Sequence, residues 1–509
     1  MRRQLSGVTI VVLLIGLLQG CAGLAPRLKP ALPDRPPQAE RFLRELDAAV
    51  FAAGVGDASS FKVAGFAYLR TDRFLAAMKE RLVDEDQKNL WVAWMVRLDA
   101  EARQKEIRNL PNATLSGLIT KCGGFSDRAT LKVQASAAAA RLWDHDRLQP
   151  GFFEALTAAV AVPDEYSAAM RVFGLYPIAA VPITIGTRAA YNKFRKWHQS
   201  PLAELTVEGR MTAFVAEGVG CGAAEKSARL FAAARRNAFG LPDLSAAEMS
   251  VLIRSYAPII SQDVAADYDR FGEVVWKDGN VSVDQRRPAV YTYITYSFIN
   301  TIPVLQINYA LWYAERSGAK TPAYEKGPLD GLTLRISLDR NGQPVMADIM
   351  NNCGCYHFYA PRKERVAKIM HSANRLYPFV PTWLPPDYPE RPLILHVNSG
   401  WHQVERLDAA AVPSAASVYR LIPYEQLEAL PHADGTRESV FTAAGIMKNS
   451  TRIEPYIFFS VGIPDIGFMR QRSHHAVKMI GRAHFTDPDI FDGKFLFHPA
   501  ASNRNGAAW

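Results

Sequence analysis

The residue pattern changes character near position 245, and this change constrains the fold more than any other feature of the chain. Before it, residues 84–109 carry an apolar helical stripe with charged side chains opposite, and residues 127–144 predict another helix. After it, residues 289–298 and 302–313 are aromatic and β-branched, and residues 332–338 alternate strictly between apolar and polar. We predict an α+β protein, with an N-terminal helical region followed by a largely antiparallel β-rich domain with peripheral helices.

Short local signals support this division. Ser245-Ala246-Ala247-Glu248 is a capping box that begins a helix, and Asp278-Gly279 is a hairpin turn between two short apolar runs. We therefore predict a helical domain over 38–245 and a β-rich domain over 246–509. Helical segments of the second domain are expected near 361–375, 423–430 and 464–482.

Residues 1–20 have the order of a secretory signal, with Arg2 and Arg3 ahead of an uncharged apolar stretch. The stretch is too short to cross a bilayer as a stable helix, which needs about 20 residues. Its ending, Leu18-Gln19-Gly20-Cys21, resembles the lipobox of bacterial lipoproteins. The resemblance implies an acylated Cys21 at the start of the mature chain, and Ala22 after it implies transport to the outer membrane. The alternative is an ordinary signal peptide with an incidental cysteine.

The proline-rich residues 21–37 predict an extended tether between this anchor and the folded chain.

The chain carries a formal charge of +9, and its charges are scattered. Such a balance favours a bilayer surface or an anionic envelope polymer as partner. Nucleic acid is not an expected partner, because no basic stretch is interleaved with aromatic residues.

One segment of the helical region is unusually apolar. Residues 172–186 contain no charged side chain, and Lys193, Arg195, Lys196 and Trp197 follow. An apolar run beside basic and aromatic residues is typical of an interfacial membrane contact, and this run is too short to span. The alternative is a helical hairpin buried in the core and broken by its prolines.

Two cysteines of the N-terminal half, Cys122 and Cys221, each lie next to glycine. Disulfides persist outside the cytoplasm, so these two residues would cross-link two parts of this half. Two small buried thiols are the alternative.

Candidate chemistry concentrates in the last third of the chain, where nine of the eleven histidines fall between residues 357 and 498. Cys353, Cys355 and His357 alternate after a predicted strand at 344–350, so they would share one face. A flat strand holds such neighbours too far apart for one ion, unless Gly354 lets the backbone bend. The alternatives for the two cysteines are a short, strained disulfide and two free buried thiols.

A second cluster surrounds Asn398-Ser399-Gly400, which is a turn signal after an apolar run. In a tight hairpin His396 and His402 would face each other across two strands, in a position to share a metal ion or to act as a base and its orienting partner. His474, His475 and His484 are additional candidates, although adjacent residues on a helix diverge and seldom bind one ion together.

Three functions are compatible with these residues. A membrane-tethered lipoprotein would bind zinc or copper through Cys353, Cys355, His357, His396 and His402. A thiol enzyme would use Cys353 or Cys355 as nucleophile, with His396 as base and Asn398 as its orienting group. A non-catalytic envelope scaffold or surface-binding lipoprotein would leave the histidines as structural residues. The sequence does not identify a substrate.

Overall fold

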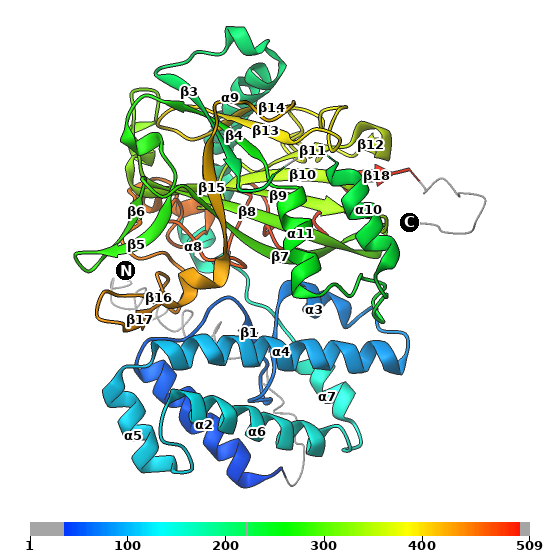
Figure 1. Ribbon diagram of the computed structural model, residues 1–509, viewed down its shortest axis with the longest axis vertical. Coiled ribbons are helices and arrows are strands. Elements are labelled where there is room, and N and C mark those ends of the chain that lie inside the picture. The colour runs from blue at the N-terminus through cyan, green and yellow to red at the C-terminus, as the bar shows by residue number, and fades with distance from the viewer. Residues whose placement is uncertain (1–34, 220–221, 499–509) are drawn as a thin grey trace, which may run out of the picture.

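The computed structural model describes residues 35–219 and 222–498 and divides them into a helical region and a larger sheet domain (Figure 1). The sheet domain confirms the predicted α+β class with peripheral helices. The helical region contains α2 (Pro37–Ala52), α3 (Arg73–Met78), α4 (Glu85–Asn109), α5 (Asn112–Cys122), α6 (Arg128–Asp146), α7 (Phe152–Ala159) and the short pair β1 (Phe61–Lys62) and β2 (Arg70–Thr71).

The two helices predicted from periodicity form almost where expected. The Asp84 side chain caps α4 by accepting a hydrogen bond from the Gln87 N–H at 2.8 Å, and Asp127 caps α6 in the same way. Trp91 and Met95 of α4 are fully buried in the core of the helical region, as is Leu131 of α6. These apolar contacts, rather than helix propensity, hold the region together.

The ten-stranded sheet is mixed. In spatial order its strands are β11 (Phe358–Pro361), β10 (Pro344–Asn351), β9 (Gly327–Leu338), β8 (Ile302–Arg316), β7 (Ala289–Ile299), β15 (Ser417–Pro423), β3 (Arg210–Ala216), β4 (Ile259–Val264), β13 (Leu393–Val397) and β14 (Val404–Ala409). Three adjacent pairs, β7–β15, β15–β3 and β4–β13, are parallel, and the other pairs are antiparallel. The long predicted strands β7, β8 and β9 are adjacent and antiparallel: residues 300–301 join β7 to β8, and the longer connection over 317–326 joins β8 to β9.

Smaller elements surround this sheet. They are α8 (Ala168–Phe173), α9 (Tyr176–Gln199), α10 (Ala223–Ala233), α11 (Ala246–Ser255) and α12 (Glu454–Ile457), with the pairs β5 (Glu273–Lys277) and β6 (Asn280–Asp284), β12 (Val366–Ile369) and β18 (Phe495–Phe497), and β16 (Leu430–Pro431) and β17 (Arg437–Glu438). The capping box at Ser245 and the Asp278-Gly279 hairpin both form as predicted.

Some sequence expectations fail where long-range contacts decide the conformation. β3, which precedes residue 245, lies inside the sheet between β15 and β4 instead of in a helical bundle. Residues 361–375 contain a single 3-10 turn followed by β12. The helical segment expected near 423–430 does form, as the 3-10 helix Tyr424–Ala429. Residues 464–482 form turns rather than a helix, because their backbone groups bond to distant segments: the Arg470 N–H donates to the Asn352 carbonyl.

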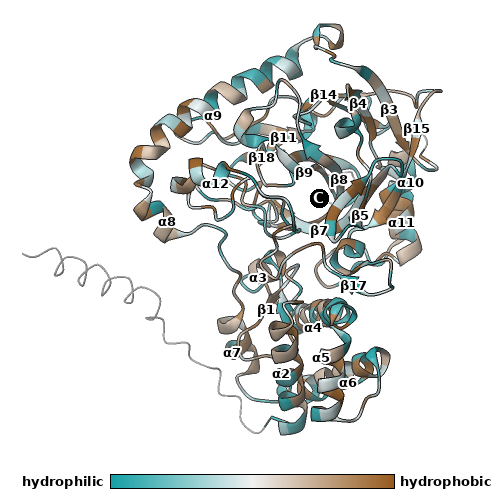
Figure 2. Ribbon diagram, turned by 90° about the vertical axis from the view of Figure 1, so that its left-hand side faces the viewer, coloured by the Kyte–Doolittle hydropathy of each residue, from teal (hydrophilic) through white to brown (hydrophobic). Residues whose placement is uncertain are grey.

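The segment over 172–186 is not buried, so the alternative of a core hairpin is wrong. It forms the end of α8 and the first half of α9, and the buried residues of α9 begin only at Tyr191. Figure 2 shows these helices at the outer edge of the sheet domain, with apolar residues among them. Within the described part of the chain, no helix is both long and apolar enough to cross a membrane.

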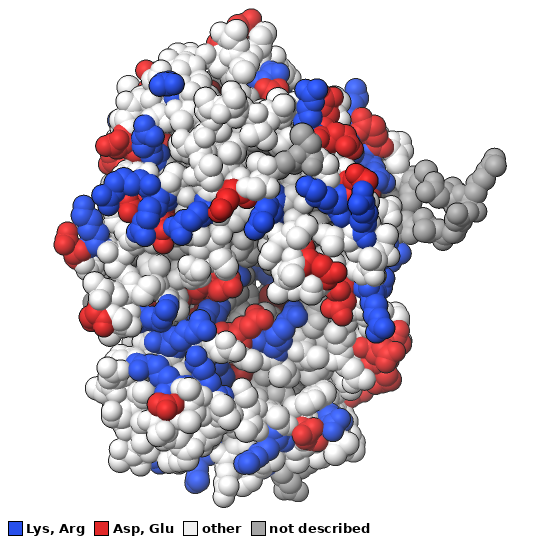
Figure 3. All heavy atoms as spheres, viewed as in Figure 1, with Lys and Arg blue, Asp and Glu red and all other residues white. Residues whose placement is uncertain are grey.

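The helical region contacts the sheet domain through a buried ionic cluster. Lys105 of α4 lies 2.8 Å from carboxylate oxygens of both Asp57 and Glu428, and Arg472 bonds Glu428 with two nitrogens at 2.8 and 2.7 Å. Figure 3 shows basic and acidic side chains gathered along the boundary between the two parts. Buried charges are stabilising only when each is paired, so this cluster fixes how the two parts meet.

We expect Lys105→Met to lower the free energy of unfolding by about 3 kcal/mol, because it leaves two buried carboxylates short of a cation. Denaturant unfolding followed by tryptophan fluorescence measures the change. Lys88→Met is the matched control, since Lys88 lies on the same helix in an exposed pair with Glu85 and its loss should have little effect. Equal effects of the two substitutions would contradict the role of the cluster.

The same cluster predicts loss of stability in acid. Burial opposes the charge of Asp57 and Glu428, yet Lys105 and Arg472 lower the pKa of Glu428, and Lys105 and Arg70 lower the pKa of Asp57 to about 2. The folded state therefore gains stability above the unfolded pKa near 4 and loses it as the pH falls toward 2. Thermal melts between pH 5 and 2 should show this decline. A melting temperature constant over this range would rule it out.

Candidate functional site

Cys353 and Cys355 lie side by side in a tight turn that follows β10. The Gly354 N–H donates to the Asn351 carbonyl at 2.7 Å, and the Asn351 N–H donates to the Cys355 carbonyl at 3.0 Å. Gly354 has a φ of +94°, and a Cβ there would lie 2.3 Å from the Ala476 carbonyl oxygen. Only glycine fits this position, so the expected bend at Gly354 is present and brings the two thiols together.

The two thiols differ in acidity. The thiol of Cys355 donates a hydrogen bond to the sulfur of Cys353, and this bond, with the charge of Arg316 and the Cys355 N–H, lowers the pKa of Cys353 to about 7 although burial opposes it. The same hydrogen bond, together with burial, raises the pKa of Cys355 well above its ordinary value. Cys353 is thus the thiolate of the pair near neutral pH.

Both thiols line an apolar cavity of about 430 Å³. Its walls come from further segments that are distant in sequence: α9, the connection between β8 and β9, Tyr377, the segment around α12, and residues 476–479. The lining includes Pro182, Ile183, Gly186, Thr187, Ala190, Tyr191, Tyr324, Glu325, Tyr356, Tyr377, Glu454, Ile457, Phe458, Ile463, Ile466 and Met479. A concave apolar space with a few polar groups is the usual form of a small-molecule site.

Glu454 of α12 is a buried carboxyl group in this cavity. Burial, followed by the negative charges of Cys353 and Glu325, raises the pKa of Glu454 to about 9. Gly467 leaves room for the carboxyl group, because a Cβ at that position would lie 1.9 Å from its Oε2 atom. Glu454 is therefore a neutral acid at pH 7 and is able to donate a proton.

Glu325, the other carboxylate of the cavity, is held by three donors. It accepts hydrogen bonds from Arg316 Nη1 at 2.7 Å, Trp401 Nε1 at 2.7 Å and the Tyr356 hydroxyl at 2.5 Å. Tyr356 belongs to the cysteine turn and Trp401 to the 396–402 stretch. The two stretches singled out in the sequence therefore meet at Glu325.

Behind Glu325, a chain of buried charges leads away from the cavity. Arg316 bonds Asp330 through two nitrogens at 3.0 and 2.8 Å, and His402 Nδ1 lies 2.7 Å from Asp330 Oδ2. His402 Nε2 lies 3.3 Å from Asp269. Burial opposes a charge on His402, but its contacts with Asp269 and Asp330 raise its pKa above the ordinary value.

The other predicted ligands do not join the cysteines. His357 Nε2 bonds Asp348 at 2.8 Å, next to the ion pair of Asp348 with Arg335, and does not line the cavity. The predicted hairpin forms, but His396 is paired with Arg406 and its ring lies 3.1 Å from Asp408. His402 lies in the connection between β13 and β14, so the two histidines do not face each other as expected. The connection is longer than the tight turn assumed.

The other three candidate histidines have hydrogen-bond partners away from the cysteines, and the Glu165 N–H also donates to His484 Nε2 at 3.2 Å. His474 bonds Glu165 at 2.9 Å and the Ala58 carbonyl at 2.7 Å, and His475 bonds the Asn352 carbonyl at 3.1 Å. His484 bonds Asp487 at 3.2 Å. Among the residues that the structure describes, no group of three or more His, Cys, Asp or Glu side chains is arranged to hold a metal ion.

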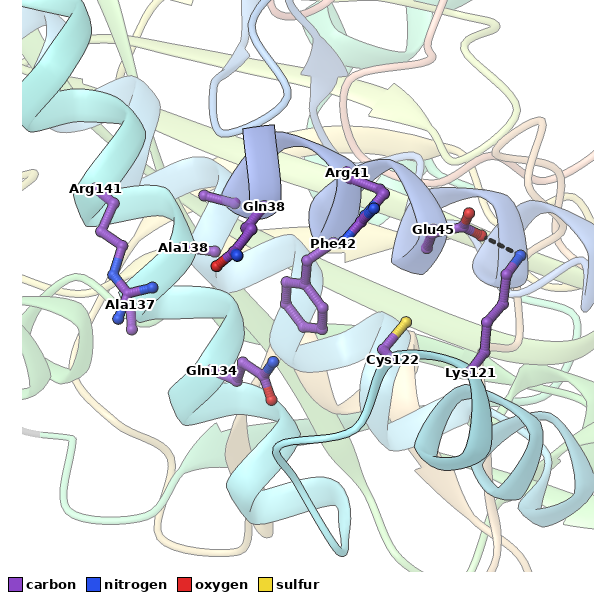
Figure 4. A pocket seen from close by; sticks show the side chains of 11 residues that line it. Gln38, Arg41, Phe42, Glu45, Lys121, Cys122, Gln134, Ala137, Ala138 and Arg141 are labelled. Atoms are coloured by element: carbon purple, nitrogen blue, oxygen red, sulfur yellow. Dashed lines mark hydrogen bonds and ion pairs between the residues drawn. The ribbon is translucent and has the colours of Figure 1, made fainter. Parts of the chain in front are cut away.

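Cys122 lies in a different hollow, a groove of about 640 Å³ between α2, α5 and α6 (Figure 4). Glu45 and Lys121 form an ion pair of 2.5 Å beside it. Burial raises the pKa of the Cys122 thiol. Cys221 and Cys21 lie outside the described residues, so the Cys122–Cys221 disulfide and the acylated Cys21 remain predictions.

Sequence reasoning found the two cysteines but missed the charged groups around them. Glu454 lies about one hundred residues from the cysteine turn, in a four-residue helix that no periodicity marks. Arg316 and Glu325 bracket the connection between two predicted strands, where charged residues are ordinarily exposed.

Comparisons with family models, with curated proteins and with solved structures find no match for this chain.

We expect alkylation to distinguish the three described thiols. With iodoacetamide, Cys353 should react with a pH midpoint near 7, whereas Cys122, whose pKa is raised, should need a higher pH. Mass spectrometry of peptides at each pH measures the modified fraction. Cys355→Ala removes the thiol donor and should move the Cys353 midpoint upward. An unchanged midpoint in Cys355→Ala would contradict the hydrogen-bonding account.

Proposed function

We propose that this protein is a membrane-tethered envelope lipoprotein whose C-terminal domain is a thiol enzyme, with Cys353 as nucleophile in acyl transfer. The observation that carries the proposal is the pairing, in one apolar cavity, of an acidified thiol with a neutral carboxylic acid. Thiolates are strong nucleophiles toward acyl carbon, and a nearby acid assists departure of the leaving group.

The step balances with the groups present. The Cys353 thiolate forms a carbon–sulfur bond to the acyl carbon of an ester, and the carbon–oxygen bond to the alcohol breaks. Glu454 donates its proton to the departing alkoxide and becomes a carboxylate. Water or a second alcohol then takes the acyl group from sulfur, regenerating the thiolate and returning a proton to Glu454. No metal or redox cofactor takes part in this sequence.

Cys355 and Glu325 act as positioning residues in this scheme. Cys355 donates to the Cys353 sulfur and so favours its anionic form. Glu325 fixes Tyr356, and with it the turn that carries both cysteines. His396, which the sequence suggested as a base, does not take part in this scheme. Its ring lies against Asp408, and the residue lines a separate hollow.

A second candidate function follows from the contact between the two thiols. In thiol–disulfide exchange, the Cys353 thiolate would attack an organic disulfide and release one thiolate, and Cys355 would then resolve the mixed disulfide. Binding of zinc or copper has less support, because the cysteines and histidines of the predicted ligand set do not converge. A non-catalytic scaffold would not explain why the pKa of Cys353 is lowered.

We expect p-nitrophenyl butyrate to acylate Cys353. The reaction should give a burst of about one equivalent of p-nitrophenolate and a butyryl mass increase on the peptide with Cys353. Its rate should rise through pH 7 as the thiolate forms and fall through pH 9 as Glu454 ionises, which gives a bell-shaped profile. Stopped-flow absorbance and mass spectrometry measure both signals.

Four substitutions show which groups produce the burst. Cys353→Ser should abolish the burst, and Cys122→Ser, which removes a thiol of the helical region, should leave it unchanged. Glu454→Gln should remove the fall through pH 9. Cys355→Ser should slow acylation but retain it. If the unsubstituted protein shows no acylation but catalyses thiol–disulfide exchange, and Cys355→Ser abolishes that exchange, the redox function is favoured instead. A burst that persists in Cys353→Ser would refute the proposal.

A further inference from the structure

We infer that α8, the first half of α9 and residues 453–459 form a docking face for a lipid bilayer, placed over the mouth of the thiol cavity. The three segments are in contact: α8 and α9 both pack on the 3-10 turn Phe459–Val461 that follows α12. Figure 2 shows α8, α9 and α12 together on one side of the sheet domain.

The face is apolar and exposed. Ile178 and Val181 of α9 expose 71% and 60% of their surface, and Tyr456 exposes 87%. The other exposed apolar side chains of the face are Val172, Phe173, Leu175, Ile185, Ile453, Ile457 and Phe459. Soluble proteins rarely leave such a concentration of large apolar side chains in water, and an apolar patch of this kind marks an interaction surface.

The charges beside the face identify the partner as a membrane rather than another protein surface. Residues 168–199 contain no Asp or Glu. Arg188, Lys193, Arg195 and Lys196 of α9 are exposed and follow the apolar half of the helix. A helix with an apolar half and a basic flank suits the interface of an anionic bilayer, where the apolar residues enter the acyl region and the cations meet phosphate groups.

The chain before the described residues allows this contact. Arg35 is held on the helical region by Asp146, with a 3.1 Å hydrogen bond from its Nε atom. Residues 21–34 would reach at most about 50 Å when extended. An acyl anchor at Cys21 would thus keep the folded chain near the membrane without fixing its orientation. The exposed face would supply that orientation.

The cavity opens toward this face. Pro182, Gly186 and Ile457 are exposed and also line the cavity, so they form its rim. With the face seated in a bilayer, an acyl chain would pass from lipid to cavity without crossing water. The substrate class is then an acyl-bearing lipid, and this part of the inference rests on the proposed function, whereas the membrane contact does not.

Vesicle binding tests the docking face. The test uses the full chain with Cys21→Ser, which removes the predicted acylation site, and vesicles of phosphatidylethanolamine and phosphatidylglycerol. We expect co-sedimentation that weakens when phosphatidylglycerol is omitted. Ile178→Glu with Val181→Glu should weaken binding at least tenfold, and Val133→Glu, an equally exposed site on α6, should not change it.

The outcomes separate the two proposals. Absence of vesicle binding, or binding unaffected by the paired α9 substitutions, would overturn the docking face even if the p-nitrophenyl butyrate burst is intact. Light scattering will show whether the chain dimerises. A dimer that dissociates when these substitutions are made, in a protein that does not bind vesicles, would assign the face to a second copy and also overturn the inference. Loss of the burst with intact vesicle binding would overturn only the thiol enzyme, because Cys353→Ser is expected to bind vesicles normally.

Discussion

Arg316 is the charge on which the geometry of the cavity depends. It is the last residue of β8 and exposes 3% of its surface, so its cation must be neutralised inside the protein. Asp330 binds it from β9 and Glu325 binds it from the connection between the strands. Glu325 in turn holds Tyr356 and Trp401, which fixes the cysteine turn against the β13–β14 connection. Removal of this one cation would leave Asp330 and Glu325 buried without the guanidinium group that they share and would loosen the wall that carries Cys353.

Local patterns predict the parts of this fold that local physics decides. Periodic burial and side-chain caps fix α4 and α6. Aromatic and β-branched runs predict β7 and β8, and strict alternation predicts β9. The sequence does not predict β3 or the turns over 464–482, because their backbone partners lie far away in the chain. Residues 361–375 fail for the same reason, since β12 exists only by pairing with β18 at the other end of the domain.

The site could be predicted only in part. The bend at Gly354 and the proximity of the two thiols follow from short spacing and the properties of glycine. The histidines looked like ligands because sequence spacing does not reveal which carboxylates they meet. Asp348 contacts His357, Asp408 contacts His396, and Asp330 and Asp269 both contact His402. Each aspartate belongs to a different strand or turn from its histidine. Only the tertiary structure therefore shows that these imidazoles contact carboxylates.

The cavity reverses the ordinary order of acidity between a thiol and a carboxyl group. In water a carboxyl group ionises near pH 4 and a thiol near pH 8.5, so at pH 7 the acid is charged and the thiol is neutral. Here the apolar walls disfavour both charges, but Cys353 has specific donors, which bring its pKa to about 7, while burial and nearby anions raise the pKa of Glu454 to about 9. Between these values a nucleophilic thiolate coexists with a protonated acid. Water entering the cavity would weaken both effects, so a site of this kind works best where lipid, not solvent, covers its opening.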